Sequence, residues 1–212
     1  MTEKLIDELS RDLRPARPRM VIARLVLGAA MGAAVAFVGV AWLLGLRPDM
    51  GHALVSRMFW MKLAYAGTIA AVGLAGAERL ARPAGEARGR LAWLWAPVIG
   101  ILAMAALQIA RTPARELRML FMGHSAMVCP WLIAAVSAPL FVALIWAVRG
   151  LAPTRLRAAG AVAGLAAGGF GALIYCLHCP EVGAPFVAIW YTLGILIPSL
   201  LGALTGPRLL RW

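Results

Sequence analysis

Apolar residues dominate this chain in six long runs that are separated by short polar connections. The runs cover residues 25–46, 58–77, 91–110, 126–148, 158–177 and a stretch within 182–207. A helix needs roughly 20 apolar residues to cross a bilayer core of about 30 Å, and each run meets or approaches that length. The pattern therefore predicts an all-α integral membrane bundle of six transmembrane helices, with a membrane domain over 25–212.

Composition supports this prediction and excludes other classes. Of the 212 residues, 62% are hydrophobic and 14% are charged, whereas soluble domains have about 45–50% and about 25%. The net charge of +12 would indicate a nucleic-acid partner in a soluble protein. Membrane proteins instead collect Lys and Arg in cytoplasmic loops, so no direct contact with nucleic acid is expected.

The distribution of basic residues predicts the orientation in the membrane. Six spans place both termini on one side, and most of the 21 Lys and Arg residues lie in segments on that side. The positive-inside rule then predicts that both termini are cytoplasmic.

The segment 1–24 contains a short amphipathic pattern. Residues 2–13 have helical periodicity, and Pro15 ends the pattern. The opposite face is mainly acidic, whereas helices that lie on membranes usually have a basic polar face. We therefore expect a groove on a cytosolic protein to cover the apolar stripe, which is formed by Leu5, Ile6, Leu9 and Leu13.

Polar residues within the predicted spans are few. Lys62 lies about one turn inside the second run, and a lysine so near the end of a span is expected to extend to the headgroups. The deep parts of the spans carry no Asp, Glu, Arg or His. A small transporter is therefore disfavoured as a function, because ion pathways normally use such residues.

Glycines recur at a spacing of four in two runs, at Gly28 and Gly32 and again at Gly160, Gly164 and Gly168. Small residues at this spacing let helix backbones approach closely. Packing within one bundle is the favoured interpretation, and a homodimer seam is the alternative.

All three cysteines fall at the end of the bundle opposite the termini. Cys129 precedes Pro130 at the start of the fourth run, while Cys176 and Cys179 lie where the fifth run ends. The fourth and fifth runs are joined by a short connection, so they are expected to be antiparallel neighbours whose outer ends meet. Cys129 and Cys179 should then share one site.

The chemistry of this site stays open between a disulfide and a soft metal ion. Thiolate, thioether and imidazole groups suit copper(I) or zinc. The candidate ligands are Cys129, Cys179, His178 and His124, with Met119, Met122 and Met127 nearby. No cofactor is required, and a metal ion would act as a signal.

The C-x-x-C spacing of Cys176 and Cys179 also raises a membrane thiol–disulfide oxidoreductase as an alternative function. The motif ends a helix, where the helix dipole disfavours a thiolate. An electron relay would also need a second cysteine pair, and only Cys129 remains.

Several polar strings, in order along the chain, resemble the NrsF family of membrane anti-sigma factors, the negative regulators of sigma F. They are Leu5-Ile-Asp-Glu-Leu9, Phe59-Trp60-Met-Lys62, Val128-Cys129-Pro130, His178-Cys179-Pro180-Glu181 and the closing Gly206-Pro-Arg-Leu-Leu-Arg-Trp212. The resemblance runs from end to end.

The resemblance implies a regulator of the bacterial inner membrane and not an enzyme. Such a protein sequesters an extracytoplasmic-function sigma factor, here through residues 1–24, and releases it under metal or oxidative stress. The two characteristic cysteines of the family correspond to Cys129 and Cys179, which are the expected sensing residues. Cys176 does not match that pattern.

Overall fold

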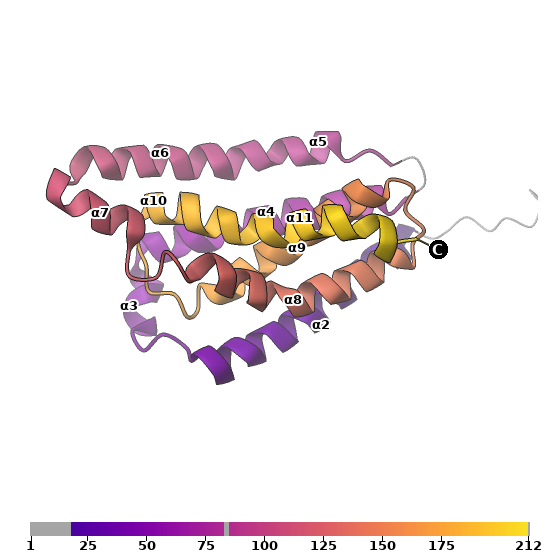
Figure 1. Ribbon diagram of the computed structural model, residues 1–212, viewed down its shortest axis with the longest axis horizontal. Coiled ribbons are helices and arrows are strands. Elements are labelled where there is room, and N and C mark those ends of the chain that lie inside the picture. The colour runs from indigo at the N-terminus through magenta and orange to yellow at the C-terminus, as the bar shows by residue number, and fades with distance from the viewer. Residues whose placement is uncertain (1–17, 83–84, 212) are drawn as a thin grey trace, which may run out of the picture.

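The computed structural model describes residues 18–82 and 85–211, and these residues form an all-helical bundle (Figure 1). The predicted sigma-binding residues Leu5, Ile6, Leu9 and Leu13 lie outside the described residues. Six helices are long and apolar enough to cross a membrane, and they cover Met20–Leu44, Arg57–Leu80, Arg88–Arg111, Cys129–Arg149, Leu156–Tyr175 and Ala184–Leu209. The predicted fold class is confirmed, with boundaries that differ by a few residues.

The spans are composites of the labelled elements. The first joins α2 (Pro18–Gly39) to a π-helical turn over Val40–Leu44, and the second is α4 (Arg57–Leu80). The third consists of α5 (Arg88–Leu91), a 3-10 turn (Ala92–Leu94) and α6 (Trp95–Arg111). The fourth and fifth are α8 (Cys129–Arg149) and α9 (Leu156–Tyr175), and the sixth joins α10 (Ala184–Phe186), a π-helical turn (Val187–Tyr191) and α11 (Thr192–Leu209).

Two short helices lie between the spans at one end of the bundle, and the sequence reading did not anticipate them. They are α3 (Met50–Val55) and α7 (Ala114–Met122). Both lie at the left in Figure 1, at the end where α9 stops and α10 begins, while the C-terminus lies at the opposite end. We call the end with α3 and α7 the cysteine end and the end with the C-terminus the basic end.

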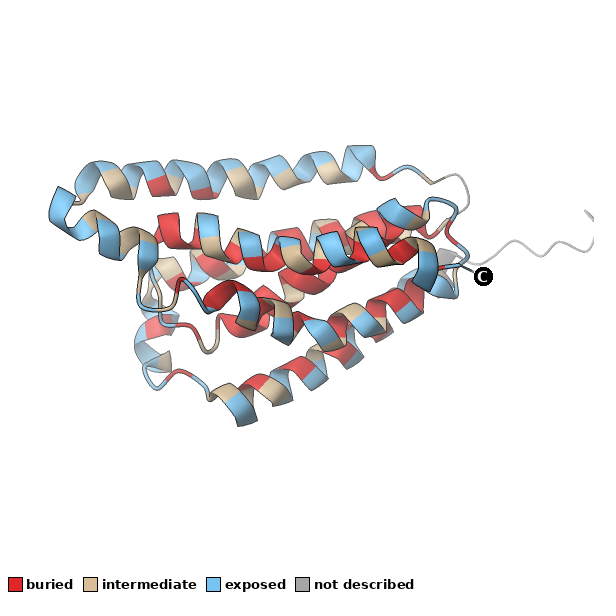
Figure 2. Cartoon of the chain, in the orientation of Figure 1, coloured by how far each residue is buried: buried red, intermediate tan, exposed pale blue. Residues whose placement is uncertain are grey.

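Helix α9 is the centre of the bundle and packs against α4, α8 and α11. Most of its residues are red in Figure 2, whereas α6 along the top is largely pale blue. Its glycines explain this close packing, because a Cβ on Gly164 would overlap the carbonyl oxygen of Pro198 in α11. A Cβ on Gly32 would likewise lie 2.7 Å from the Cα of Leu140 in α8. Both small-residue seams are therefore internal, as the favoured interpretation predicted.

Replacing Gly164 with valine should destabilise the bundle, because the new side chain has no space between α9 and α11. Overpacking of this kind typically costs about 1–3 kcal/mol. The measurement is the thermal unfolding midpoint in detergent. Gly100→Val is the matched control, since no heavy atom lies within 4 Å of a Cβ built at Gly100. Equal midpoints for both variants would contradict the packing argument.

Candidate thiol site

Cys129 and Cys179 meet in the interior at the cysteine end, although 50 residues separate them in the sequence. Cys129 is the first residue of α8, and Cys179 lies in the loop between α9 and α10. Their exposed fractions are 0% and 1%, and both belong to one buried cluster. Both are free cysteines, as is the buried Cys176. The structure thus brings together the pair that the sequence places at one site.

The environment of Cys179 favours its ionised form. The neighbouring Cys129 thiol, with smaller contributions from the Lys62 charge and Tyr191, lowers the pKa of Cys179 despite its burial. For Cys176, burial prevails and raises the pKa to about 11. The thiolate is the nucleophilic form of cysteine, so Cys179 is the better nucleophile of these two.

Lys62 holds the Cys179 loop from the side of α4. Its Nζ donates hydrogen bonds to the carbonyl oxygens of Cys179 at 3.0 Å and Glu181 at 2.6 Å. The expectation that this side chain extends to the headgroups is wrong, because the residue is fully buried. Carbonyl oxygens of the loop between α9 and α10 satisfy the ammonium in the interior, so it does not need to reach water.

Arg47 holds the same loop from the linker between the first span and α3. Its backbone N–H donates to the carbonyl of Leu177 at 3.0 Å, and Nη1 lies 3.4 Å from the carbonyl oxygen of Cys179. The Asp49 carboxylate accepts two bonds from the guanidinium, at 2.7 and 2.6 Å. These two hydrogen bonds between Arg47 and Asp49 raise the pKa of the guanidinium and lower the pKa of the carboxyl group. The linker and the cysteine loop are thereby connected.

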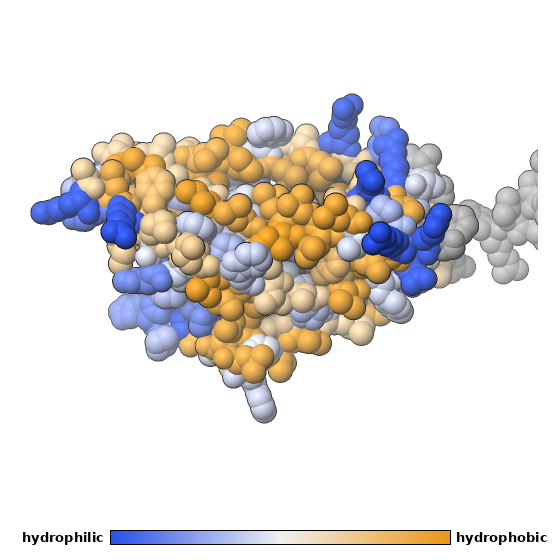
Figure 3. Space-filling model, in the orientation of Figure 1, coloured by the Kyte–Doolittle hydropathy of each residue, from blue (hydrophilic) through white to orange (hydrophobic). Residues whose placement is uncertain are grey.

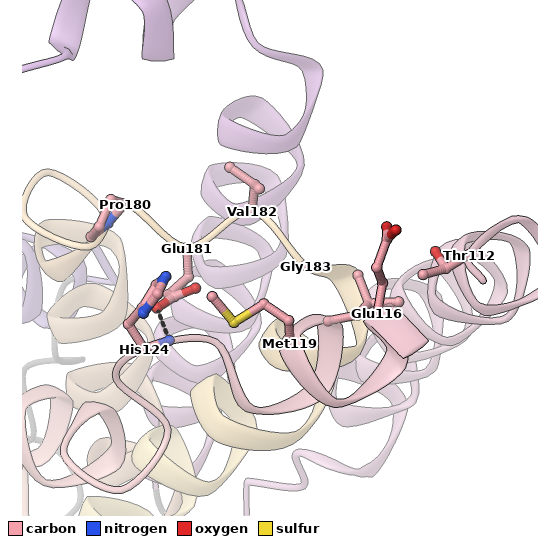
Figure 4. Close-up of a pocket in the computed structure, with 9 residues that line it drawn as sticks. Thr112, Glu116, Met119, His124, Pro180, Glu181, Val182 and Gly183 are labelled. Carbon is pink, nitrogen blue, oxygen red and sulfur yellow. Dashed lines mark hydrogen bonds between the residues drawn. The ribbon is translucent and has the colours of Figure 1, made fainter. Parts of the chain in front are cut away.

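The two histidines have partners other than the thiols. His178 Nδ1 lies 2.9 Å from the carbonyl oxygen of Gly45, which places this ring on the linker. His124 is exposed, and its backbone N–H donates to Glu181 Oε1 at 2.7 Å (Figure 4). Within residues 18–82 and 85–211, no group of three or more His, Cys, Asp or Glu residues is placed to hold a metal ion. The ligand set of Cys129, Cys179, His178 and His124 is therefore not gathered at one point.

A hollow of about 460 Å³ opens beside the cysteine loop. In Figure 4 His124 and Met119 approach Glu181 from the α7 side, and Pro180 and Val182 belong to the loop itself. Met119, Met122 and Met127 are all exposed. The methionines and His124 thus lie at the outer surface, whereas the sulfurs of Cys129 and Cys179 are buried.

Comparison with known proteins agrees with the resemblance of the polar strings. The profile of the family described as "NrsF: Negative regulator of sigma F" matches residues 9–212. The chain belongs to the NrsF family.

Two curated NrsF relatives cover the whole chain. The "Probable anti-sigma-F factor NrsF" of Azospira oryzae is 42% identical over 211 residues, with 100% of this chain and 99% of the relative covered. The "Anti-sigma-F factor NrsF" of Caulobacter vibrioides is 40% identical over 218 residues, with the same coverage. No solved structure matches this NrsF chain.

Reasoning from the sequence of this NrsF chain missed Lys62 and Arg47 as part of the site. Lys62 did carry a signal, because it is the single charged residue within the second apolar run. Arg47 carried none, since an arginine between two spans is common. The bonds of both residues end on backbone carbonyls of a distant loop, which side-chain identity does not reveal.

Proposed function

We propose that this protein is an anti-sigma factor of the bacterial inner membrane that holds an extracytoplasmic-function sigma factor inactive. Release follows when the Cys129–Cys179 pair reacts under stress at the periplasmic face. The observation that carries the sensing part is that these two cysteines are buried in one cluster, where each thiol shifts the pKa of the other. Family membership over the whole chain, with relatives named as anti-sigma-F factors, supports the regulatory part.

The proposed orientation places the basic end in the cytoplasm. Figure 3 shows strongly hydrophilic side chains gathered at the end of the molecule where Figure 1 marks the C-terminus. An apolar band separates them from a smaller hydrophilic group at the other end. This asymmetry follows the positive-inside rule, so both termini and the sigma-binding segment 1–24 would face the cytoplasm.

Reporter fusions test this topology. Fusions after Gly89 and after Trp212 should show cytoplasmic activity, and a fusion after Glu181 should show periplasmic activity. The reason is that an even number of spans returns the chain to its starting side. An active periplasmic reporter after Trp212 would contradict the proposed orientation.

The geometry favours disulfide formation over metal capture as the chemistry of the signal. Two cysteines are buried in one cluster, whereas no group of three or more His, Cys, Asp or Glu residues that could hold a metal ion is found in the described ranges. With a peroxide as oxidant, the Cys179 thiolate would attack one oxygen, forming a sulfenic acid and releasing the other oxygen as water after protonation. The Cys129 thiol would then attack that sulfur, and a second water would leave. In this scheme the protein needs no cofactor and acts as a regulator.

The contacts of the cysteine loop provide a route for the signal toward the cytoplasm. Leu177, His178 and Cys179 are bonded to Gly45 and Arg47, which directly follow the first span. That span leads back to the proposed sigma-binding segment. A bond between the sulfurs would shift the loop, and it can bias release only if the oxidised pair favours one arrangement of these helices.

Co-purification tests the proposal. Full-length protein carrying an affinity tag should retain a sigma factor of its own organism after gentle detergent extraction. Treatment of the complex with hydrogen peroxide should release that sigma factor, and a reductant should restore binding. A yield of sigma factor equal to that of an untagged control would overturn the regulatory part. If the sigma factor stays bound under peroxide but is released by cadmium, the signal is capture of a soft cation and not disulfide formation.

A further inference from the structure

Lys62 is a buried cation that has no acidic partner among the described residues. The residue is 0% exposed, and its hydrogen bonds go to the carbonyl oxygens of Cys179 and Glu181. The ion pairs found within residues 18–82 and 85–211 all involve arginine. Burying a charge is costly unless it is paired. A methionine of similar length would pack at lower cost, so a lysine at this position suggests that its charge has a role.

The neighbouring carboxylates are committed to other groups. Glu181 accepts hydrogen bonds from the backbone N–H of His124 and from Ser125 Oγ, and Asp49 pairs with Arg47. On its remaining side, the ammonium lies 5.7 Å from the centre of the Tyr191 ring. Apart from the Tyr191 phenol, the groups near Lys62 that can take up negative charge during a reaction are the thiols of the cysteine cluster.

We propose that Lys62 is the cationic positioning residue of the thiol site. Its ammonium compensates the negative charge on the Cys179 sulfur when that sulfur reacts, and its two hydrogen bonds hold the loop in reach of Cys129. This inference rests on the proposed function, in which the cysteine pair is the reacting group.

The charges around Cys179 agree with this role. The Cys129 thiol, the Lys62 ammonium, the Tyr191 hydroxyl and the backbone N–H of Glu181 all lower its pKa against the effect of burial. The Arg47 guanidinium also interacts electrostatically with Cys179, but it is paired with the Asp49 carboxylate. Of the two cations beside this loop, Lys62 is the one whose charge has no carboxylate partner among the described residues. A nearby cation is one of the recognised ways in which proteins make a cysteine reactive.

The test separates charge from loop anchoring by two substitutions. Lys62→Arg keeps the positive charge, and Lys62→Gln keeps a hydrogen-bond donor without charge. Both are made in the full-length protein with Cys176→Ala, which leaves only the two cysteines of the site. Purified protein in detergent is treated with hydrogen peroxide, and disulfide formation is followed by mass spectrometry across a range of pH.

Lys62→Gln should slow disulfide formation by about tenfold or more at neutral pH and move the pH profile toward higher pH, because each unit of pKa changes the thiolate fraction about tenfold. Lys62→Arg should stay within a few-fold of the parent and keep its profile. A parent-like rate and profile for Lys62→Gln would overturn the inference. Equal slowing of both variants with an unchanged pH profile would also overturn it, since Lys62 would then only hold the loop in place and its charge would not affect the reaction.

A measurement on the unsubstituted protein covers the case in which Lys62→Gln does not fold. Thiolates absorb near 240 nm, so the difference spectrum between the parent and its Cys179→Ser variant reports whether Cys179 is ionised. A thiolate at pH 7.5 supports the inference, and its absence overturns it without any change at Lys62.

The inference and the proposed function fail in different ways. If Cys129→Ser and Cys179→Ser cells still respond to stress normally, the sensing proposal fails whatever the oxidation rates are. If those variants lose the response while Lys62→Gln oxidises like the parent, only the role of Lys62 fails.

Discussion

Replacing Leu5 and Leu9 together by aspartate is expected to abolish binding of the sigma factor and to switch on its target genes without stress. Burial of each aliphatic side chain in a protein groove contributes roughly 1.5–3 kcal/mol. Loss of two such anchors would weaken binding by about 3–6 kcal/mol, or roughly two to four orders of magnitude. The added carboxylates would also need to be desolvated in the groove, which opposes binding further.

The readouts are co-purification of the sigma factor and the activity of a reporter gene under its control. Asp7→Asn with Glu8→Gln is the matched control, because it changes the same helical pattern on the polar face. This control should bind and repress like the parent. Membrane insertion should be unchanged in both variants, since the six spans lie outside the altered segment. Co-purification of the Leu5→Asp, Leu9→Asp variant at parental yield would place the binding site elsewhere.

Serine at Cys129 or at Cys179 is expected to abolish induction of the target genes by oxidants. A disulfide needs both sulfurs, so either single change should lower induced expression to the uninduced level. For the same reason the double change should be no worse than either single change. The measurement is reporter activity with and without peroxide, together with immunoblots that show equal protein levels.

Because Cys129 and Cys179 are buried, the loss of induction should be checked with a second substitution at each position. Both cysteines are buried, and an unsatisfied buried hydroxyl costs about 1–3 kcal/mol. Alanine at the same positions removes the sulfur without adding a hydroxyl and should give the same loss of induction. Cys176→Ser is the matched control, because it alters a buried cysteine of the same cluster, and it should respond almost like the parent. Full induction in the Cys129→Ser and Cys179→Ser variants would show that these cysteines only pack.

Hydropathy predicted the spans because the energetic rule behind it is local. About 20 apolar residues in sequence are stable across a bilayer whatever the rest of the chain does. The short helices α3 and α7 escaped prediction, since connections of this length obey no such rule. The two π-helical turns, Val40–Leu44 and Val187–Tyr191, were likewise not predicted, because their residue types do not indicate an extra residue in a helical turn.

The candidate site was predictable only in part. The short connection between the fourth and fifth runs was enough to bring Cys129 and Cys179 to one end, and the structure buries both in one cluster. The same argument grouped His178 and His124 with them. In the structure, however, the His178 ring contacts the carbonyl oxygen of Gly45, and His124 is exposed at the surface. Position along a helix axis follows from sequence, whereas the direction of a side chain depends on the element that packs against it.

The sequence by itself determined the six spans, the end at which the cysteines lie and, through its ordered polar strings, the family. These properties depend on the order and type of neighbouring residues. Only the tertiary structure decided that Lys62 is buried and that Arg47 is tied to the cysteine loop. The side chain of a lysine one turn inside a span can extend outward to water or point into the bundle. It points inward when hydrogen-bond acceptors are available in the interior. Here the carbonyls of Cys179 and Glu181, more than 100 residues away in sequence, supply those acceptors.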